Sequence, residues 1–194
     1  MKRSLRILPP VLWSLLLASC IPLGSDSKRV GDLFTQWGEE DARLNQALGE
    51  RVYDKDFDVA FSAVVTSLSD MGFAVKNMER QSGYILAEGL QPLPKDQELK
   101  LGQMMCDEIN KVSFQRWVPR LGNATKSVTI SVLRLGDQKT KLKMRIANTA
   151  INGGANTTRY QEEYPPILQA EYQFIWRGLE KQIFLDENLD KIKH

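Results

Sequence analysis

The strongest constraint on the fold is a period-two alternation in the second half of the chain. In KTKLKMRIANTAI, residues 139–151, alternate positions are apolar or basic: Leu142, Met144 and Ile146 against Lys141, Lys143 and Arg145. Successive side chains of a strand point to opposite faces, so the segment predicts a strand with one buried and one solvated face. The preceding run SVTISVLRL, residues 127–135, is joined to it by Gly-Asp-Gln, which predicts an antiparallel hairpin.

A shorter set of elements precedes this hairpin. Residues 51–54 (RVYD) predict a strand, and the next segment predicts a helix that Asp56 caps and Gly72 ends. One face of that helix is apolar: Phe57, Ala60, Phe61, Val64, Val65, Leu68 and Met71. FAVKNME and YILAEG, on either side of the turn RQSG, predict a second hairpin.

The chain closes with a long amphipathic helix. Pro165 and Pro166 suit its first turn, and it is expected to run to about residue 189. Its apolar stripe consists of Leu168, Tyr172, Ile175, Trp176, Leu179 and Ile183. Residues 90–125 form an insertion that contains one further helix. The order β-α-β-β-(α)-β-β-α predicts a single α+β domain over residues 51–194, with an antiparallel sheet covered on one face by two helices.

The first 19 residues have three parts. Basic Lys2, Arg3 and Arg6 precede an apolar run over residues 7–17, and small residues follow. This order predicts a secretory signal peptide, and the run is too short to predict a membrane span. Leu17-Ala18-Ser19-Cys20 resembles the lipobox of bacterial lipoproteins, which implies cleavage between Ser19 and Cys20 and attachment of acyl chains such as palmitate to Cys20. The alternative is an ordinary signal peptide with a chance cysteine.

Acylation of Cys20 would fix the chain to a membrane, because several acyl chains anchor stably where one alone binds marginally. Residue 21 is Ile, and the absence of Asp there favours the outer membrane in enterobacteria-like sorting. We expect an outer-membrane lipoprotein that faces the periplasm. Residues 20–29, the acylated cysteine and a stretch without periodicity, predict a tether. Residues 30–50 predict an amphipathic helix packed on the chain's own domain; a partner or the membrane surface are alternative sites for it.

The charge balance changes when the signal peptide is removed. The 194 residues carry 26 Lys+Arg and 24 Asp+Glu; loss of residues 1–19 removes three basic residues and no acidic one, which leaves 23 against 24. A mature net charge near −1 gives no support to nucleic-acid binding.

A family resemblance covers residues 51–89 best. The helix FSAVVTSLSDMGFAV and the hairpin VKNMERQSGYILAEG, behind a lipobox and before a long C-terminal helix, resemble the helix-grip lipoproteins of the BamC (NlpB) kind. The resemblance implies a helix-grip-like fold. It carries no catalytic signature.

Residues for catalysis or metal binding are scarce. The only histidine is His194, the last residue, and Cys106 is expected to be a small buried residue; a reactive or intermolecularly paired thiol is the alternative. The adjacent acids Glu39-Glu40, Glu162-Glu163 and Asp186-Glu187 are expected at the solvated surface, because neighbours point different ways. We predict no catalytic residues, no metal and no cofactor, and hence no enzyme.

One segment combines aromatic and basic residues: Phe114, Arg116, Trp117 and Arg120. It is expected to plug the end of the sheet; exposed, it would be the best partner-binding patch, because Trp and Arg dominate binding hot spots. The expected function is a non-catalytic interaction or assembly module of the cell envelope with an envelope protein as partner. The alternative is a lipid-anchored carrier of a small apolar ligand held between helix and sheet.

Overall fold

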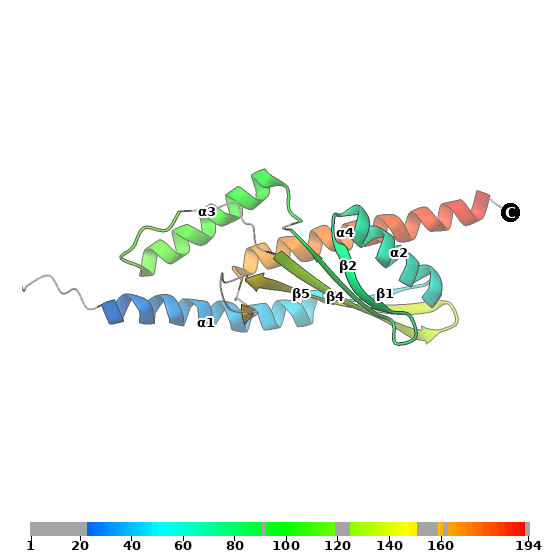
Figure 1. Cartoon of the computed structure of the whole chain (residues 1–194), viewed down its shortest axis with the longest axis horizontal. Coiled ribbons are helices and arrows are strands. Elements are labelled where there is room, and N and C mark those ends of the chain that lie inside the picture. The colour runs from blue at the N-terminus through cyan, green and yellow to red at the C-terminus, as the bar shows by residue number, and fades with distance from the viewer. Residues whose placement is uncertain (1–22, 91, 119–124, 151–158, 161–162, 193–194) are drawn as a thin grey trace, which may run out of the picture.

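The computed structural model describes residues 23–90, 92–118, 125–150, 159–160 and 163–192. Figure 1 shows a sheet layer with helices against it and further helices that project beyond it at one end. The elements in chain order are α1 (Leu23–Leu48), β1 (Glu50–Tyr53), α2 (Phe57–Asp70), β2 (Ala74–Glu79), β3 (Tyr84–Gly89), α3 (Lys95–Val112), β4 (Thr125–Gly136), β5 (Lys139–Ala150), β6 (Arg159–Tyr160) and α4 (Pro165–Ile192).

The strands form one antiparallel sheet in the order β1-β5-β4-β3-β2, and β6 pairs with the end of β5. The alternating segment is the long strand β5, in which Met144 lies opposite Ile130 of β4. β1 pairs with the start of β5, so the first strand and the long hairpin are neighbours. The predicted hairpins are confirmed.

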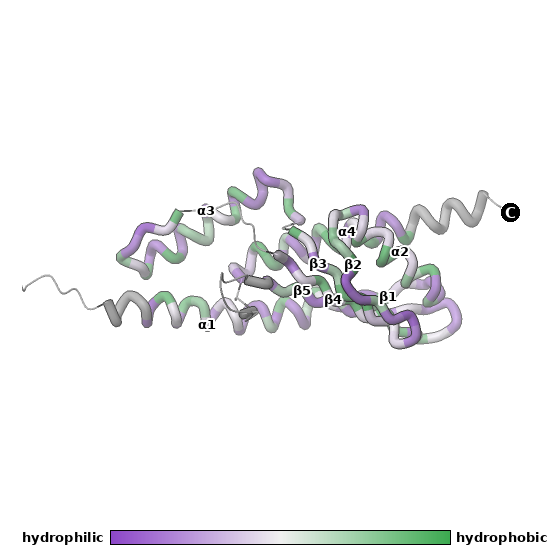
Figure 2. The backbone as a smooth tube through the Cα atoms, viewed as in Figure 1, coloured by the Kyte–Doolittle hydropathy of each residue, from purple (hydrophilic) through white to green (hydrophobic). Residues whose placement is uncertain are grey.

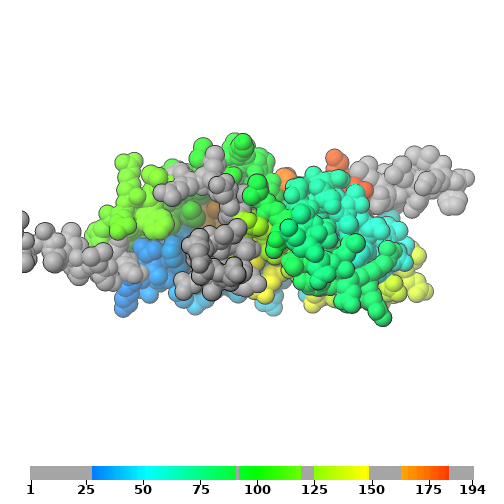
Figure 3. Space-filling model, viewed as in Figure 1, coloured from blue at the N-terminus to red at the C-terminus, as the bar shows by residue number. Residues whose placement is uncertain are grey.

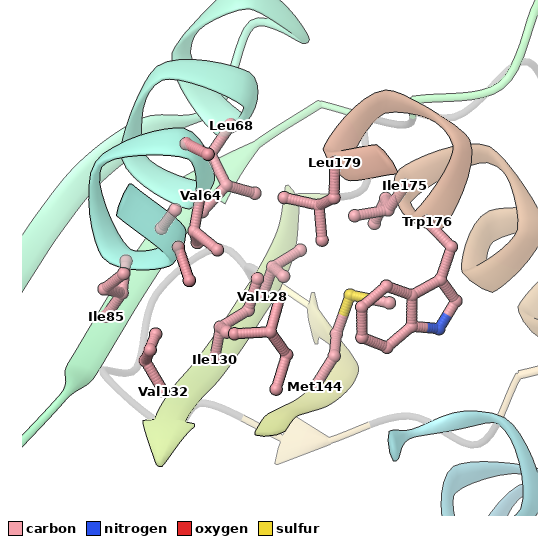
Figure 4. Packing of buried hydrophobic residues seen from close by; sticks show 14 of the residues in the cluster. Val64, Leu68, Ile85, Val128, Ile130, Val132, Met144, Ile175, Trp176 and Leu179 are labelled. Atoms are coloured by element: carbon pink, nitrogen blue, oxygen red, sulfur yellow. The ribbon is translucent and has the colours of Figure 1, made fainter. Parts of the chain in front are cut away.

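The apolar face of the sheet is covered by α2 and α4, which also pack against each other. Val128, Ile130 and Val132 of β4 are buried on this face, in one apolar cluster with residues of both helices (Figure 4). The predicted apolar stripe of α4 is buried along its length: Leu168, Tyr172, Ile175, Trp176, Leu179 and Ile183. The predicted α+β class, with a helix-covered antiparallel sheet, is confirmed.

The ends of α2 follow the predicted local chemistry. The Asp56 carboxylate accepts hydrogen bonds from the backbone N–H groups of Asp58 and Val59 at 2.8 and 2.9 Å, which caps the helix. After the last turn Gly72 has φ = 85°, a left-handed conformation that only glycine adopts freely. α2 is therefore fixed at both ends by residues that the sequence identifies.

The segment before the sheet differs from its prediction. Helix α1 begins at Leu23, so the predicted tether is wrong from that residue onward; residues 1–22 lie outside the described part of the chain. Apolar and polar residues alternate along α1 and α3 (Figure 2), and the two helices pack together with the start of α4. Buried Trp37, Ile109, Tyr164 and Ile167 form the centre of this second apolar cluster. The helix of residues 30–50 thus packs on the chain itself.

Hydrogen bonds join the end of α1 to the sheet core. The indole Nε1 of Trp176 donates to the carbonyl oxygen of Leu48 at 2.8 Å. The Tyr172 hydroxyl lies 2.5 Å from Oδ1 of Asn45 and 3.2 Å from the Met144 carbonyl oxygen. Burial raises the pKa of Tyr172 to about 12, so this hydroxyl remains a donor at all ordinary pH values.

Candidate functional site

The predicted anchoring residues, Ser19 and Cys20, lie outside the described part of the chain, which begins with α1 at Leu23. Only residues 21 and 22 separate Cys20 from that helix. The start of α1 therefore stays close to any membrane that holds an acylated Cys20.

Three of the four predicted partner-binding residues follow α3 directly, and they are exposed. Phe114 is 69% exposed, Trp117 40% and the adjacent Val118 57%, and Arg116 is exposed as well. The expectation that this segment plugs the sheet is wrong, because α3 carries it away from the sheet. Arg120 lies outside the described residues. We call Phe114, Trp117 and Val118 the aromatic tip.

The aromatic tip is held in a defined conformation by Asn110 and Ser113. The Asn110 side chain accepts from the Trp117 N–H at 2.7 Å and donates to the Trp117 carbonyl oxygen at 3.0 Å. The indole Nε1 lies 3.3 Å from the Ser113 hydroxyl oxygen. These bonds hold the segment against the last turn of α3, and Trp117 stays partly exposed to solvent.

A second surface feature lies at the opposite end of the sheet. A groove of about 530 Å³ opens between the start of α2, the β2–β3 turn and the end of β4. We call it the distal groove; its lining residues are Phe57, Asp58, Arg80, Gln81, Ser82, Val132, Leu133 and Arg134. The turn lies close to β4 because residue 83 is glycine: a Cβ there would lie 2.0 Å from the Val132 carbonyl oxygen.

The distal groove carries more positive than negative charge. Arg80 donates from Nε and Nη2 to one carboxylate oxygen of Asp58, at 3.1 and 2.9 Å. The guanidinium carbon of Arg134 lies 4.3 Å from the ring centroid of Phe57. A guanidinium stacked on a ring keeps its in-plane N–H donors for another carboxylate. The groove can therefore receive an acidic group beside an apolar surface.

A third feature, which sequence patterns did not predict, is a buried ionic cluster of Lys126, Glu163 and Glu171. Lys126 on β4 is 1% exposed, Glu171 on α4 0%, and Glu163 8%. The Lys126 ammonium contacts Oε1 of Glu163 and lies 2.7 Å from Oε1 of Glu171. The expectation that Glu163 is solvated is therefore wrong; Glu162 and the side chains of Asp186 and Glu187 lie outside the described part.

Burial governs the protonation of this cluster. It raises the pKa of Glu171 to about 8, with Glu163 adding to the effect and Lys126 opposing it. Burial alone would lower the pKa of Lys126, but the two carboxyl groups outweigh it and raise that pKa. A protonated Glu171 beside a Lys126–Glu163 ion pair leaves the cluster neutral near pH 7.

The ionic cluster also reaches α1. The backbone N–H of Glu163 donates to Oδ2 of Asp41 at 2.9 Å. Three elements distant in sequence, α1, β4 and the start of α4, thus meet at one buried polar point. This point joins the sheet to the projecting helices. In the described part of the chain, no group of three or more His, Cys, Asp or Glu residues is placed to hold a metal ion.

The other predicted features have plain positions. Cys106 is buried on α3, as expected, and burial raises the pKa of its thiol. The described side chains between α2, α4 and the sheet form one buried apolar cluster (Figure 4). His194 lies outside the described residues. None of the helices in the described ranges is both long and apolar enough to span a bilayer.

Comparison with known proteins assigns the chain to no family. No protein-family model and no curated protein matches it. The solved structure of TTHA0849 from Thermus thermophilus is similar at a TM-score of 0.31 and 10% identity, over 71% of this chain and 95% of that one. The elements on their own define the class: an α+β protein whose sheet module carries a projecting helical end.

Proposed function

We propose that the chain is a lipid-anchored, non-catalytic interaction module of the cell envelope, held through Cys20 in the outer membrane and facing the periplasm. The observation that best supports this is the separation of its two ends. The start of α1, which follows Cys20 closely in the sequence, lies at one end of the molecule (Figure 1). The start of α2, the β2–β3 turn and the end of β4, which line the distal groove, lie toward the other end. The 26 residues of α1 alone span about 39 Å, so the groove is several nanometres from the start of α1.

The distal groove is the surface we assign to the protein partner. Arginine and aromatic side chains recur at the energetic centres of interfaces, and here Arg134 is stacked on Phe57. Because Arg134 and Arg80 outnumber Asp58, the partner segment is expected to be acidic. The BamC-like resemblance of the sequence belongs to this proposal, since it also points to an envelope lipoprotein.

The carrier of a small apolar ligand remains the alternative proposal. It has less support, because buried apolar side chains of α2, α4 and the strands face one another between the helices and the sheet. The distal groove is open and lined partly by charged residues, which does not suit an apolar ligand.

The test is site-specific photo-crosslinking in intact cells that make the full chain. A photoreactive residue at Gln81, in the groove, should give a discrete adduct, whereas one at Lys100, exposed on α3, should not. Arg134→Glu should abolish the Gln81 adduct and Arg134→Lys should retain part of it. An adduct that survives Arg134→Glu, or equal adducts at both positions, would refute the assignment. Co-purification of an apolar molecule would favour the alternative.

A further inference from the structure

We infer that the aromatic tip enters the headgroup layer of the same membrane that holds the acyl chains of Cys20, so that the chain contacts the bilayer at two points. The inference rests on the proposed anchoring through Cys20. Its partner is a phospholipid surface, and the aromatic tip is the contact.

The position of the aromatic tip relative to the anchor carries the first part of the argument. The Arg29 guanidinium carbon lies 5.9 Å from the ring centroid of Phe114, so the tip is beside the first turns of α1. Arg29 is six residues after Leu23, a rise of about 9 Å, and the step from Cys20 to Leu23 spans at most about 11 Å. Phe114 is therefore confined to within a few nanometres of the lipid attachment point.

The direction of α3 explains why the tip is at this end. α3 packs on α1 with its last turn next to the start of α1, so the two helices are antiparallel. Figure 3 shows the blue residues of α1 and the green residues of α3 side by side at the end of the molecule that carries the start of α1. Residues far apart in the sequence thus share the membrane-proximal end.

The chemistry of the tip is that of a membrane interface. Phe114 and Val118 are apolar and more than half exposed, and Trp117 combines an apolar ring with an N–H donor near Ser113. Tryptophan concentrates at the headgroup level of bilayers for this reason. Arg29 lies beside Phe114, its neighbour Lys28 and the tip's own Arg116 are exposed, and cations near an anionic membrane surface are attracted to it.

The distance to the anchor favours a membrane over a protein as the partner. A patch of three apolar side chains is too small to form a stable protein interface alone. Beside a lipid anchor the acyl chains already supply the membrane affinity, so the same patch needs only to orient the protein on the bilayer. A second contact point would fix the angle of α1 to the bilayer and direct the distal groove outward.

The test uses the quenching of tryptophan fluorescence by brominated acyl chains. The mature chain, purified with its lipid, is reconstituted in vesicles of phosphatidylethanolamine and phosphatidylglycerol. Of its tryptophans, Trp37 and Trp176 are buried, which makes Trp117 the accessible reporter. Brominated lipid should quench the wild type, and Trp117→Phe should reduce the quenched fraction on the order of threefold.

A matched pair of charge substitutions separates tip contact from general membrane proximity. Phe114→Asp should lift the tip and reduce quenching of Trp117 severalfold. Leu90→Asp is the control: Leu90 is 67% exposed, like Phe114, but precedes α3, whose 18 residues span about 27 Å. It should leave quenching unchanged.

The outcomes distinguish this inference from the proposed function. Mass spectrometry first determines whether Cys20 is acylated. An acylated, vesicle-bound chain whose Trp117 is not quenched overturns the inference and leaves the anchoring proposal standing. Equal loss of Trp117 quenching in Phe114→Asp and Leu90→Asp also overturns the inference. An unmodified Cys20 together with no vesicle binding overturns both.

Discussion

The sheet core and the projecting helical end differ in how much apolar surface each buries. Among the residues that the structure describes, the sheet core contains 21 buried apolar residues from α2, α4, the strands and Phe73, and the helical end contains six. Free energy from burial scales with area removed from water, so the sheet core dominates the stability of the chain. The difference predicts that the helical end can be altered with a smaller loss of stability than the sheet core.

The two regions meet at buried polar contacts as well as at apolar ones, since Phe174 packs against both clusters. Lys126, Glu163 and Glu171 lie at the junction, together with the hydrogen bond from Glu163 to Asp41. Buried polar groups have strict partner requirements, and they can therefore fix one arrangement of the helices on the sheet.

The largest effect is expected from a matched pair of tryptophan deletions. Trp176→Ala removes a buried ring and its bond to Leu48 from the sheet core, and should lower the free energy of unfolding by about 3–5 kcal/mol. Trp37→Ala, in the thinner helical end, should lower it by about 1–3 kcal/mol. Urea denaturation followed by circular dichroism measures both. Equal losses would mean that the two regions form one cooperative core.

Removal of the buried lysine tests the junction. Lys126→Met leaves Glu163 and Glu171 buried with no cation between them, and should destabilise the fold by about 3–5 kcal/mol. Combining it with Glu163→Gln and Glu171→Gln removes the charges together and should recover part of the loss. If Lys126→Met alone were as stable as the wild type, the charges of Glu163 and Glu171 would have to be solvated, which contradicts their burial.

The sequence predicted the sheet core well and the junction poorly, for a physical reason. Period-two and helical patterns report which side chains share a face, and they identified the burial of Met144 on β5 and Trp176 on α4. Lys126 occupies an inward position of β4 that pattern rules assign to an apolar residue, and its partners lie 37 and 45 positions further along the chain. No local signal links these three residues.

The predicted partner residues illustrate the same limit. Phe114 and Trp117 stood out by composition, yet whether they cover the sheet or face solvent depends on how α3 packs on α1. No local sequence pattern in the insertion indicates which element α3 packs against. The distal groove was missed because its lining comes from three separate turns and helix ends.

The pH dependence of stability should trace to Glu171. Because burial raises its pKa to about 8 from an ordinary value of 4.5, the folded chain holds a proton there that the unfolded chain has lost. The free energy of unfolding should therefore fall between about pH 5 and pH 8, by on the order of a few kcal/mol, and level off above. Glu171→Gln should flatten this slope. Denaturation midpoints across that range measure it; an unchanged slope would assign the titration elsewhere.

Two glycines give the smallest contrast between the regions. Gly83, at the β2–β3 turn, has φ = 72° and lies against the Val132 carbonyl, so Gly83→Ala should destabilise the sheet module by about 1–3 kcal/mol. At Gly31 in α1, an added Cβ would meet no atom within 4 Å, and Gly31→Ala should stabilise the helix by up to about 1 kcal/mol. Thermal melts compare the two; changes of the same sign would contradict the contrast.

The anchoring of the helical end through Cys20 is tested most directly by mass spectrometry of the N-terminal peptide of the mature chain. We predict a peptide that begins at Cys20 and carries a diacylglyceryl thioether together with an acyl chain on its amino group. An unmodified Cys20, or a mature chain that begins at another residue, would contradict the account.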